Sequence, residues 1–198
     1  MRRGGLFPLL LTSFFSLFLG TLTVAGATSK PTRIVSLTLG TDEILLSLVE
    51  AKRITAVTRY ALDATLSNVA DLAKHIPNHI AEAGVETIVA LAPDLILAAR
   101  YTSSDVVRQL EGLGFAVVLL SEFSSLKGIE GNIRSIGAAV GEPEKAEALV
   151  HEMTRRLDAV AAQGSKIKDK PGLLSYDVSG WTAGKETTFD ELVTLAGG

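Results

Sequence analysis

"GVETIVALAPDLILAARYTSS", residues 84 to 104, decides the fold of this chain. Its first half carries apolar side chains at spacings of three and four, which predict a helix, and Pro93 ends that helix. The segment 95–99, "LILAA", is apolar throughout and predicts a strand buried on both faces, as in a parallel sheet. The apolar run then stops abruptly at Arg100 and Tyr101. A cation and a phenol at the end of a buried strand raise the question of what they bind.

The same alternation of strand and helix continues on both sides of this stretch. The pattern predicts strands at 33–37, 54–57, 95–99 and 116–120. It predicts helices at 41–49, 85–92, 104–114 and 126–140, the first with Thr41 as its N-cap. The region 59–82 is less regular, and we expect a loop with one or two helical turns. The sequence therefore predicts an α/β fold: a Rossmann-like lobe with a mostly parallel sheet and helices on both faces.

A different organisation follows Gly141. Apolar residues at helical spacing predict one long helix over 142–166, with Pro143 suited to its first turn. The segment 167–198 then predicts a strand at 173–178 and a final helix. One strand and one helix cannot form a core of their own. We therefore expect an N-terminal α/β lobe at 28–141, a connecting helix, and the incomplete beginning of a C-terminal α/β lobe.

The first 27 residues have the pattern of a secretory signal peptide. Arg2 and Arg3 are followed by an apolar stretch at 6–24 and by Ala25-Gly26-Ala27, a small-x-small cleavage pattern. The alternative is an uncleaved membrane anchor, because the apolar stretch approaches spanning length. The chain contains no cysteine that a lipid anchor would need. We expect a soluble periplasmic protein.

Composition excludes several classes of function. The chain has 198 residues, a formal net charge of −3 and no cysteine, which rules out disulfides, zinc–thiolate sites and iron–sulfur clusters. No basic patch points to nucleic acid. The stretch 180–187, "GWTAGKET", departs from a phosphate-binding loop in its glycine spacing, and Pro77 separates His75 from His79. We expect no resident cofactor or metal, no enzymatic activity and a monomer.

Six segments together resemble one protein family. In chain order they are "RIVSLTLGTDEILLSL", "ITAVTRY", "GVETIVALAPDLILA", "QLEGLGFAVVLL", "IGAAVGEPEKAEAL" and "TAGKETTFDELVTLAGG". They resemble the periplasmic substrate-binding proteins of ABC importers for ferric siderophores, haem and vitamin B12. The resemblance implies a rigid protein whose two lobes, joined by one long helix, hold a metal chelate between them.

The resemblance also implies a partner, the inner-membrane ABC permease. In this family one glutamate on each lobe docks onto permease arginines. The matching positions here are Glu86, at the start of a helix, and Glu186, in the "GKE" stretch, where Glu191 competes for the role. The alternative interpretation is that both are ordinary solvent-exposed acids at helix starts.

Two Arg-Tyr pairs follow predicted strands, and we expect them to form the ligand site. Arg59 and Tyr60 follow the strand at 54–57, as Arg100 and Tyr101 follow the strand at 95–99. Ligands of open α/β sheets lie beyond the carboxyl ends of the strands. Arginine binds carboxylates and other anions, and tyrosine packs on an apolar chelate. Alternatively, these side chains merely cap strand ends at the surface.

The second lobe is expected to close the site with Trp181 and Thr182. Vitamin B12 binders of the resembled family line their cleft with tryptophans, whereas Trp181 is the only tryptophan here. The favoured function is therefore a carrier of a ferric siderophore. Three alternatives stay open: a haem or vitamin B12 carrier of the same family, a periplasmic α/β enzyme, and a nonfunctional fragment.

Overall fold

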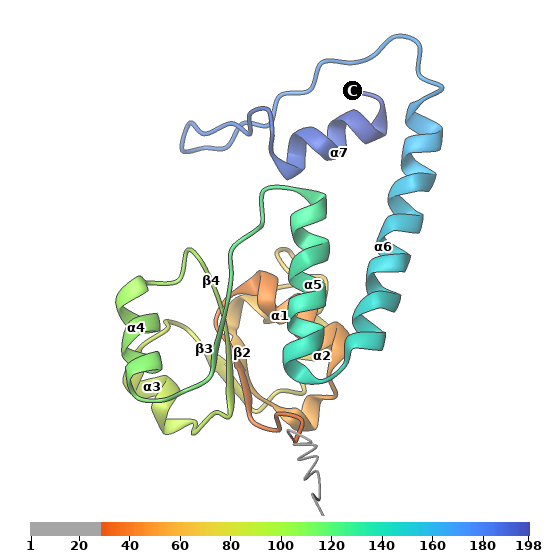
Figure 1. The fold of residues 1–198 in the computed structure, drawn as a ribbon. Helices are drawn as coiled ribbons and strands as arrows, with labels where there is room; N and C mark the ends of the chain where they lie inside the picture. Colours follow the sequence, from red (N-terminus) through yellow and green to blue (C-terminus); the bar gives the residue numbers. More distant parts are fainter. Residues whose placement is uncertain (1–28) are drawn as a thin grey trace, which may run out of the picture.

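The computed structural model describes residues 29–198, and the predicted signal segment 1–27 lies outside them (Figure 1). Five strands form one sheet in the order β3-β2-β1-β4-β5, and every neighbouring pair is parallel. The strands are β1 (Ile34–Ser36), β2 (Ile54–Thr58), β3 (Asn78–Ile80), β4 (Leu95–Ala99) and β5 (Val117–Leu120). The predicted parallel sheet is confirmed.

The strand order reverses direction at the centre of the sheet. From β1 the chain adds β2 and β3 on one side, and then crosses back to add β4 and β5 on the other. Connections leaving β1 and β4 therefore diverge at their carboxyl ends. Such a switch point opens a crevice at that edge of the sheet.

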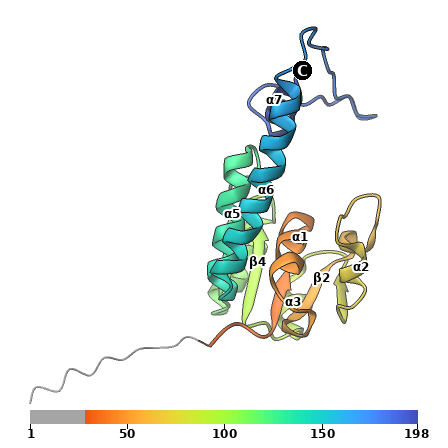
Figure 2. The same cartoon turned by 90° about the vertical axis from the view of Figure 1, so that its right-hand side faces the viewer.

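Helices cover both faces of the sheet, as predicted (Figures 1 and 2). One core packs the sheet against α1 (Leu39–Leu48), α5 (Leu126–Val140) and α6 (Pro143–Gly164). The other core packs it against α3 (Val85–Ala90) and α4 (Ser104–Gly112). Neighbouring strand residues serve opposite faces: Leu97 belongs to the first core and Ile96 to the second. The wholly apolar sequence of β4, which is buried at all five positions, follows from this double burial.

The short elements η1 (Ala51–Arg53), η2 (Arg59–Leu62) and α2 (Ala70–Ala73) complete the lobe. Two details of the prediction were wrong here. The expected loop at 59–82 contains β3, an edge strand in which only Ile80 is buried, so its apolar pattern is weak. Thr38, not Thr41, is the N-cap of α1; the two residues form a reciprocal capping box because Thr41 occupies the third helical position.

The long helix is confirmed as α6, a helix of 22 residues with Pro143 at its start. It extends beyond the sheet and packs on α7 (Thr188–Ala196) (Figure 1). This contact requires glycine at position 164, because a Cβ there would lie 2.3 Å from the Leu195 carbonyl oxygen.

The predicted strand at 173–178 was wrong. Within residues 29–198 this segment forms no strand and pairs with none. A strand needs a hydrogen-bonding neighbour, and none of the described strands lies beside it. Its apolar side chains are exposed, including Leu174 at 78% and Tyr176 at 71%. Apolar content alone therefore misled the prediction.

No helix within residues 29–198 is long and apolar enough to cross a membrane.

A partly buried ion pair ties the amino end of the lobe to the start of α6. Arg53 donates to Glu142 Oε1 at 2.7 Å, to the Val140 carbonyl at 2.5 Å and to the Pro31 carbonyl at 2.8 Å. The two charged side chains are only 12% and 14% exposed. Removal of Arg53 would leave the Val140 and Pro31 carbonyl oxygens short of a donor, whereas Glu142 Oε1 would keep Lys30 Nζ at 3.0 Å.

We therefore expect Arg53→Ala to lower the free energy of unfolding by about 2–3 kcal/mol. Lys52→Ala is the matched control, because the Lys52–Glu50 pair is exposed and exposed pairs contribute little to stability. Urea unfolding followed by circular dichroism measures both. Equal losses for the two variants would contradict a structural role for the buried pair.

Candidate functional site

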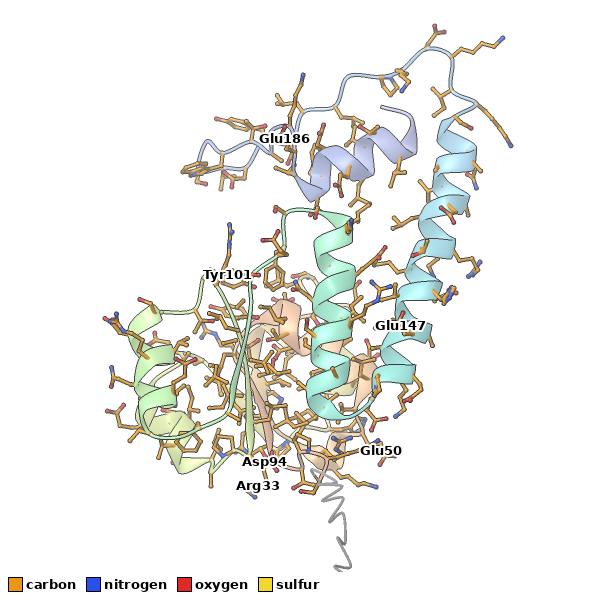
Figure 3. The ribbon with its side chains drawn as sticks, in the orientation of Figure 1. Arg33, Glu50, Asp94, Tyr101, Glu147 and Glu186 are labelled. Atoms are coloured by element: carbon orange, nitrogen blue, oxygen red, sulfur yellow. The ribbon has the colours of Figure 1, made fainter. Side chains whose placement is uncertain are left out.

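A hollow of ≈ 400 Å³ lies at the carboxyl edge of the sheet. Its lining comes from the loops that follow β1, β3 and β4 and from η2. The lining residues are Leu37, Thr38, Leu39, Tyr60, Ala83, Tyr101, Thr102 and Ser103. Tyr101 lies at the end of the sheet that faces the segment carrying Glu186, whereas Arg33 and Asp94 lie at the opposite end (Figure 3). The hollow therefore occupies the crevice that the strand order opens.

Tyr101 stands against an aromatic ring that the sequence did not indicate. Its ring meets Phe123 edge-on, with centroids 5.6 Å apart and an interplanar angle of 62°. Gly40 permits this packing, because a Cβ there would lie 3.3 Å from the Phe123 ring and 3.8 Å from the Tyr101 hydroxyl. Phe123 lies in the connection after β5, where no periodic pattern marks it. The contact orients Tyr101 at the hollow and leaves the residue 63% exposed.

Tyr60 reaches the hollow from η2. Tyr60 is 44% exposed, and the Arg59 guanidinium carbon lies 5.3 Å from the centroid of its ring. A cation over an aromatic face is attracted by the negative charge of that face. Arg59 thus lies beside the lining tyrosine without lining the hollow itself.

Arg100 is exposed at the end of β4. Its backbone N–H donates to the Leu120 carbonyl at 2.8 Å and so extends the β4–β5 ladder. Its guanidinium makes no hydrogen bond or ion pair with any residue in 29–198 that the structure records. Of the four predicted residues, the structure brings Tyr60 and Tyr101 to one hollow, while Arg59 and Arg100 are their exposed neighbours.

A network of buried hydroxyls supports the floor of the hollow. Ser36 and Thr41 share a hydrogen bond of 2.7 Å between their hydroxyl oxygens, and Thr38 and Thr41 share one of 2.9 Å. The Thr41 hydroxyl also lies 2.8 Å from the Thr38 carbonyl, to which it donates. Because several bonds hold the turn between β1 and α1, Thr38 presents a fixed surface to the hollow.

A buried carboxylate lies beside this network. Asp42, in the first turn of α1, is fully buried. Its Oδ2 accepts from the Thr58 backbone N–H at 3.1 Å and from the Thr58 hydroxyl at 2.5 Å, whereas its Oδ1 has no hydrogen-bond partner. Burial raises the pKa of Asp42 to about 7, although the nearby Ser36 hydroxyl and the hydrogen bonds from Thr58 act in the opposite direction.

The other predicted wall is a turn that presents Trp181. Asp177 Oδ1 accepts from the Ser179 N–H, the Ser179 hydroxyl and the Trp181 N–H at 2.8, 2.6 and 3.2 Å. Trp181 is 74% exposed and Thr182 is exposed beside it. Neither is among the residues that line this hollow. The strand that was expected just before them, at 173–178, is absent from the described residues.

The two candidate docking glutamates are both exposed. Glu86 lies in the first turn of α3. Glu186 has a φ of 60°, a left-handed conformation that costs free energy in a residue with a Cβ, and its N–H donates to Asp190 Oδ2 at 3.0 Å. Glu191, the competing acid, is engaged elsewhere: its Oε2 accepts from the Leu126 N–H at 2.6 Å.

The structure offers no metal centre of protein ligands within residues 29–198, because no three His, Cys, Asp or Glu side chains gather there. His79 Nε2 lies 3.0 Å from the Ala73 carbonyl oxygen, so this ring is held by backbone.

The fold and the hollow invite comparison with known proteins. Residues 34–198 match the family model described as "Periplasmic binding protein". The chain belongs to the periplasmic binding protein family.

The curated relatives of this periplasmic binding protein are named for the ligand cobalamin. A cobalamin-binding protein of Halobacterium salinarum is 25% identical over 171 residues, which are 86% of this chain and 46% of the relative. The chain thus spans about half the length of the curated relatives it matches.

Solved structures agree on the fold. A possible iron-binding periplasmic solute-binding protein from Staphylococcus epidermidis has a TM-score of 0.70 at 24% identity, covering 85% of this chain and 66% of that one. The periplasmic vitamin B12 binding protein BtuF of Vibrio cholerae has a TM-score of 0.66 at 22% identity, covering 84% and 64%. At these identities the likeness establishes the architecture alone.

The raised pKa of Asp42 predicts stability that falls as pH rises. The folded chain keeps this proton up to about pH 7, whereas the unfolded chain releases it near 3.8. Between these values the folded state binds more protons, so the stabilisation is complete below 3.8 and is lost as pH rises through about 7. A shift of this size corresponds to about 4 kcal/mol at most.

Asp42→Asn cannot titrate, so its free energy of unfolding should fall less between pH 5 and pH 8 than that of the unmodified chain. Urea unfolding at the two pH values measures the difference. Asp158→Asn, at an exposed position of α6, is the control and should keep the original slope. An unchanged slope in Asp42→Asn would show that Asp42 does not carry the effect.

Proposed function

We propose that the protein is the solute-binding component of an ABC import system that captures a metal chelate in the periplasm. The observation that carries the proposal is the hollow at the carboxyl edge of a parallel sheet, lined by Tyr60 and Tyr101. This is where open α/β sheets bind their ligands. Membership of the periplasmic binding protein family supports binding rather than catalysis.

A ferric siderophore is the ligand we favour, with haem and cobalamin as alternatives within the same class. Two exposed tyrosine rings offer flat apolar surface to a chelate, and their hydroxyls offer hydrogen bonds to its oxygens. Arg59 and Arg100 place two permanent positive charges beside the rings, which suits an anionic chelate. The names of the relatives, iron-binding and cobalamin-binding, support the class without selecting its member.

The second wall of the site is proposed to come from Trp181 and Thr182. The proposed organisation is an N-terminal lobe at 28–141, the connecting helix at 142–166, and the first part of a C-terminal lobe at 167–198. A signal peptide at 1–27 would deliver the protein to the periplasm, where we expect a monomer.

Delivery of the ligand is proposed to use Glu86 and Glu186 as contacts for the inner-membrane permease. Both side chains are exposed on the two parts of the molecule, and the engagement of Glu191 with α5 leaves Glu186 as the acid free to meet a partner. The left-handed backbone of Glu186 is a local cost of the kind that accumulates at functional sites.

Quenching of Trp181 fluorescence tests the binding function, because this is the single tryptophan of the chain. The probes are ferrichrome, ferric enterobactin, haemin and cyanocobalamin, with the iron-free siderophores as controls. Saturable quenching by at least one metal chelate is expected. If none of the four changes the fluorescence and calorimetry records no heat, the proposed function is wrong.

Arg100→Ala should weaken an anionic chelate by about 1.5–3 kcal/mol, because a charged hydrogen bond is lost. That corresponds to roughly 10- to 150-fold in Kd. Arg108→Ala removes an equal charge from α4, where Arg108 pairs with exposed Asp105, and should leave Kd unchanged. Titration by Trp181 quenching measures both variants. Equal Kd values for the two variants would return Arg100 to the role of a surface residue.

Charge reversal at Glu86 or Glu186 should abolish delivery without changing ligand affinity. The measurement is chelate-stimulated ATP hydrolysis by the permease in liposomes, together with Kd from quenching. The control is Glu111→Lys, because Glu111 is also an exposed glutamate but lies on α4. Full stimulation by both Glu86→Lys and Glu186→Lys would exclude these glutamates as docking contacts.

A further inference from the structure

The corner between β2 and η2 brings Tyr60 to the hollow, and little else in that corner is fixed by side-chain bonds. Thr58 ends β2, and Arg59 and Tyr60 follow it as the first residues of η2. Thr58 occupies the N-cap position, yet its hydroxyl makes no capping bond to η2. Arg59 and Tyr60, the two residues that follow Thr58, are both exposed.

The Thr58 hydroxyl points instead to Asp42. One carboxylate oxygen accepts both donors of Thr58, the backbone N–H at 3.1 Å and the hydroxyl at 2.5 Å. Asp42 is held in turn by α1, whose first turn lies on the buried hydroxyl network of Ser36 and Thr41. The bond therefore joins the start of α1 to the corner that carries Tyr60.

The presence of a carboxyl group at position 42 indicates that the bond to Thr58 has a structural purpose. A buried carboxyl without a cation is destabilising, and one of its two oxygens lacks any partner. The charged group that acts on it is Glu43 on the same helix, which also disfavours the charged form; β1 and β2 contribute hydroxyls only, from Ser36 and Thr58. An apolar side chain would fill this space without that cost, but it would not hold Thr58.

We propose that Asp42 is a positioning residue for the ligand site, which fixes Tyr60 at the hollow by holding both donors of Thr58. The inference rests on the proposed function, in which Tyr60 contacts the ligand. Asp42 itself is fully buried and touches no ligand. Its effect passes through two residues of backbone, from Thr58 to Tyr60.

The first test needs no ligand. The chain has three tyrosines, so 3-fluorotyrosine labelling gives three ¹⁹F resonances that Tyr→Phe variants assign. Asp42→Ala should shift or broaden the resonance of Tyr60 and leave those of Tyr101 and Tyr176 in place. Val140→Ala, a core substitution on α5 at the opposite end of the lobe, should destabilise the fold and leave all three resonances unchanged. An unmoved Tyr60 resonance in Asp42→Ala overturns the proposal.

The second test uses conservative variants and the chelate of the four-probe panel that quenches Trp181. Asp42→Ala and Thr58→Val should each raise Kd about tenfold, whereas Asp42→Asn and Thr58→Ser, which keep the acceptor and the hydroxyl, should stay within about threefold. If all four variants bind equally well, Asp42 has a structural role only.

The two outcomes separate the inference from the proposed function. If no chelate of the panel binds the unmodified chain, the proposed function fails, and the ¹⁹F spectra alone decide whether Asp42 positions Tyr60. If a chelate binds and the Tyr60 resonance does not respond to Asp42→Ala, the function stands and the positioning role falls.

Discussion

All five strands of the described residues run in the same direction, and that constraint determines where the hollow lies. In a parallel sheet every strand ends at the same edge, and every connection back to the next strand must leave from it. The strand order reverses between β1 and β4, so the connections diverge there. The hollow between Tyr60 and Tyr101 is the direct result. At the opposite edge the side chains serve stability, as Asp94 does by accepting from the Thr32 and Arg33 backbone N–H groups.

The floor of the site is stabilised by polar groups that are withdrawn from water. Ser36, Thr38 and Thr41 satisfy one another and the first turn of α1, and Asp42 satisfies Thr58. Networks of this kind specify one geometry more strictly than apolar packing, because each missing partner leaves a buried polar group unsatisfied. The exposed tyrosines therefore stand on a rigid base, which suits a site that binds without large rearrangement.

Sequence alone predicted the sheet, its parallel strands and most helices. Burial on both faces of the sheet requires an uninterrupted apolar strand such as 95–99. The end of α5 was also predictable, because a glycine, Gly141, follows it with a positive φ. Sequence alone could not predict β3, whose edge position leaves one buried residue, or the absence of a strand at 173–178, which depends on a neighbour and not on composition. At the hollow, the positions of Tyr60 and Tyr101 were predictable, because both residues follow strands. Phe123 and Asp42 were not, because a lone aromatic in a connection and an acid in the first turn of a helix have common, unremarkable explanations.

Phe123 also links the hollow to the second part of the molecule. Its ring supports Tyr101, and its carbonyl oxygen accepts from the Thr188 hydroxyl of α7 at 3.0 Å. Glu191, one turn further along α7, accepts from the Leu126 N–H at the start of α5, where the helix dipole favours a carboxylate. Two bonds and the α6–α7 packing thus fix α7 above the carboxyl edge of the sheet (Figure 1). A ligand that displaced Tyr101 would press on Phe123, and through its backbone on the contact that orients α7. The geometry of the hollow and the placement of α7 are therefore coupled, because Phe123 contacts both.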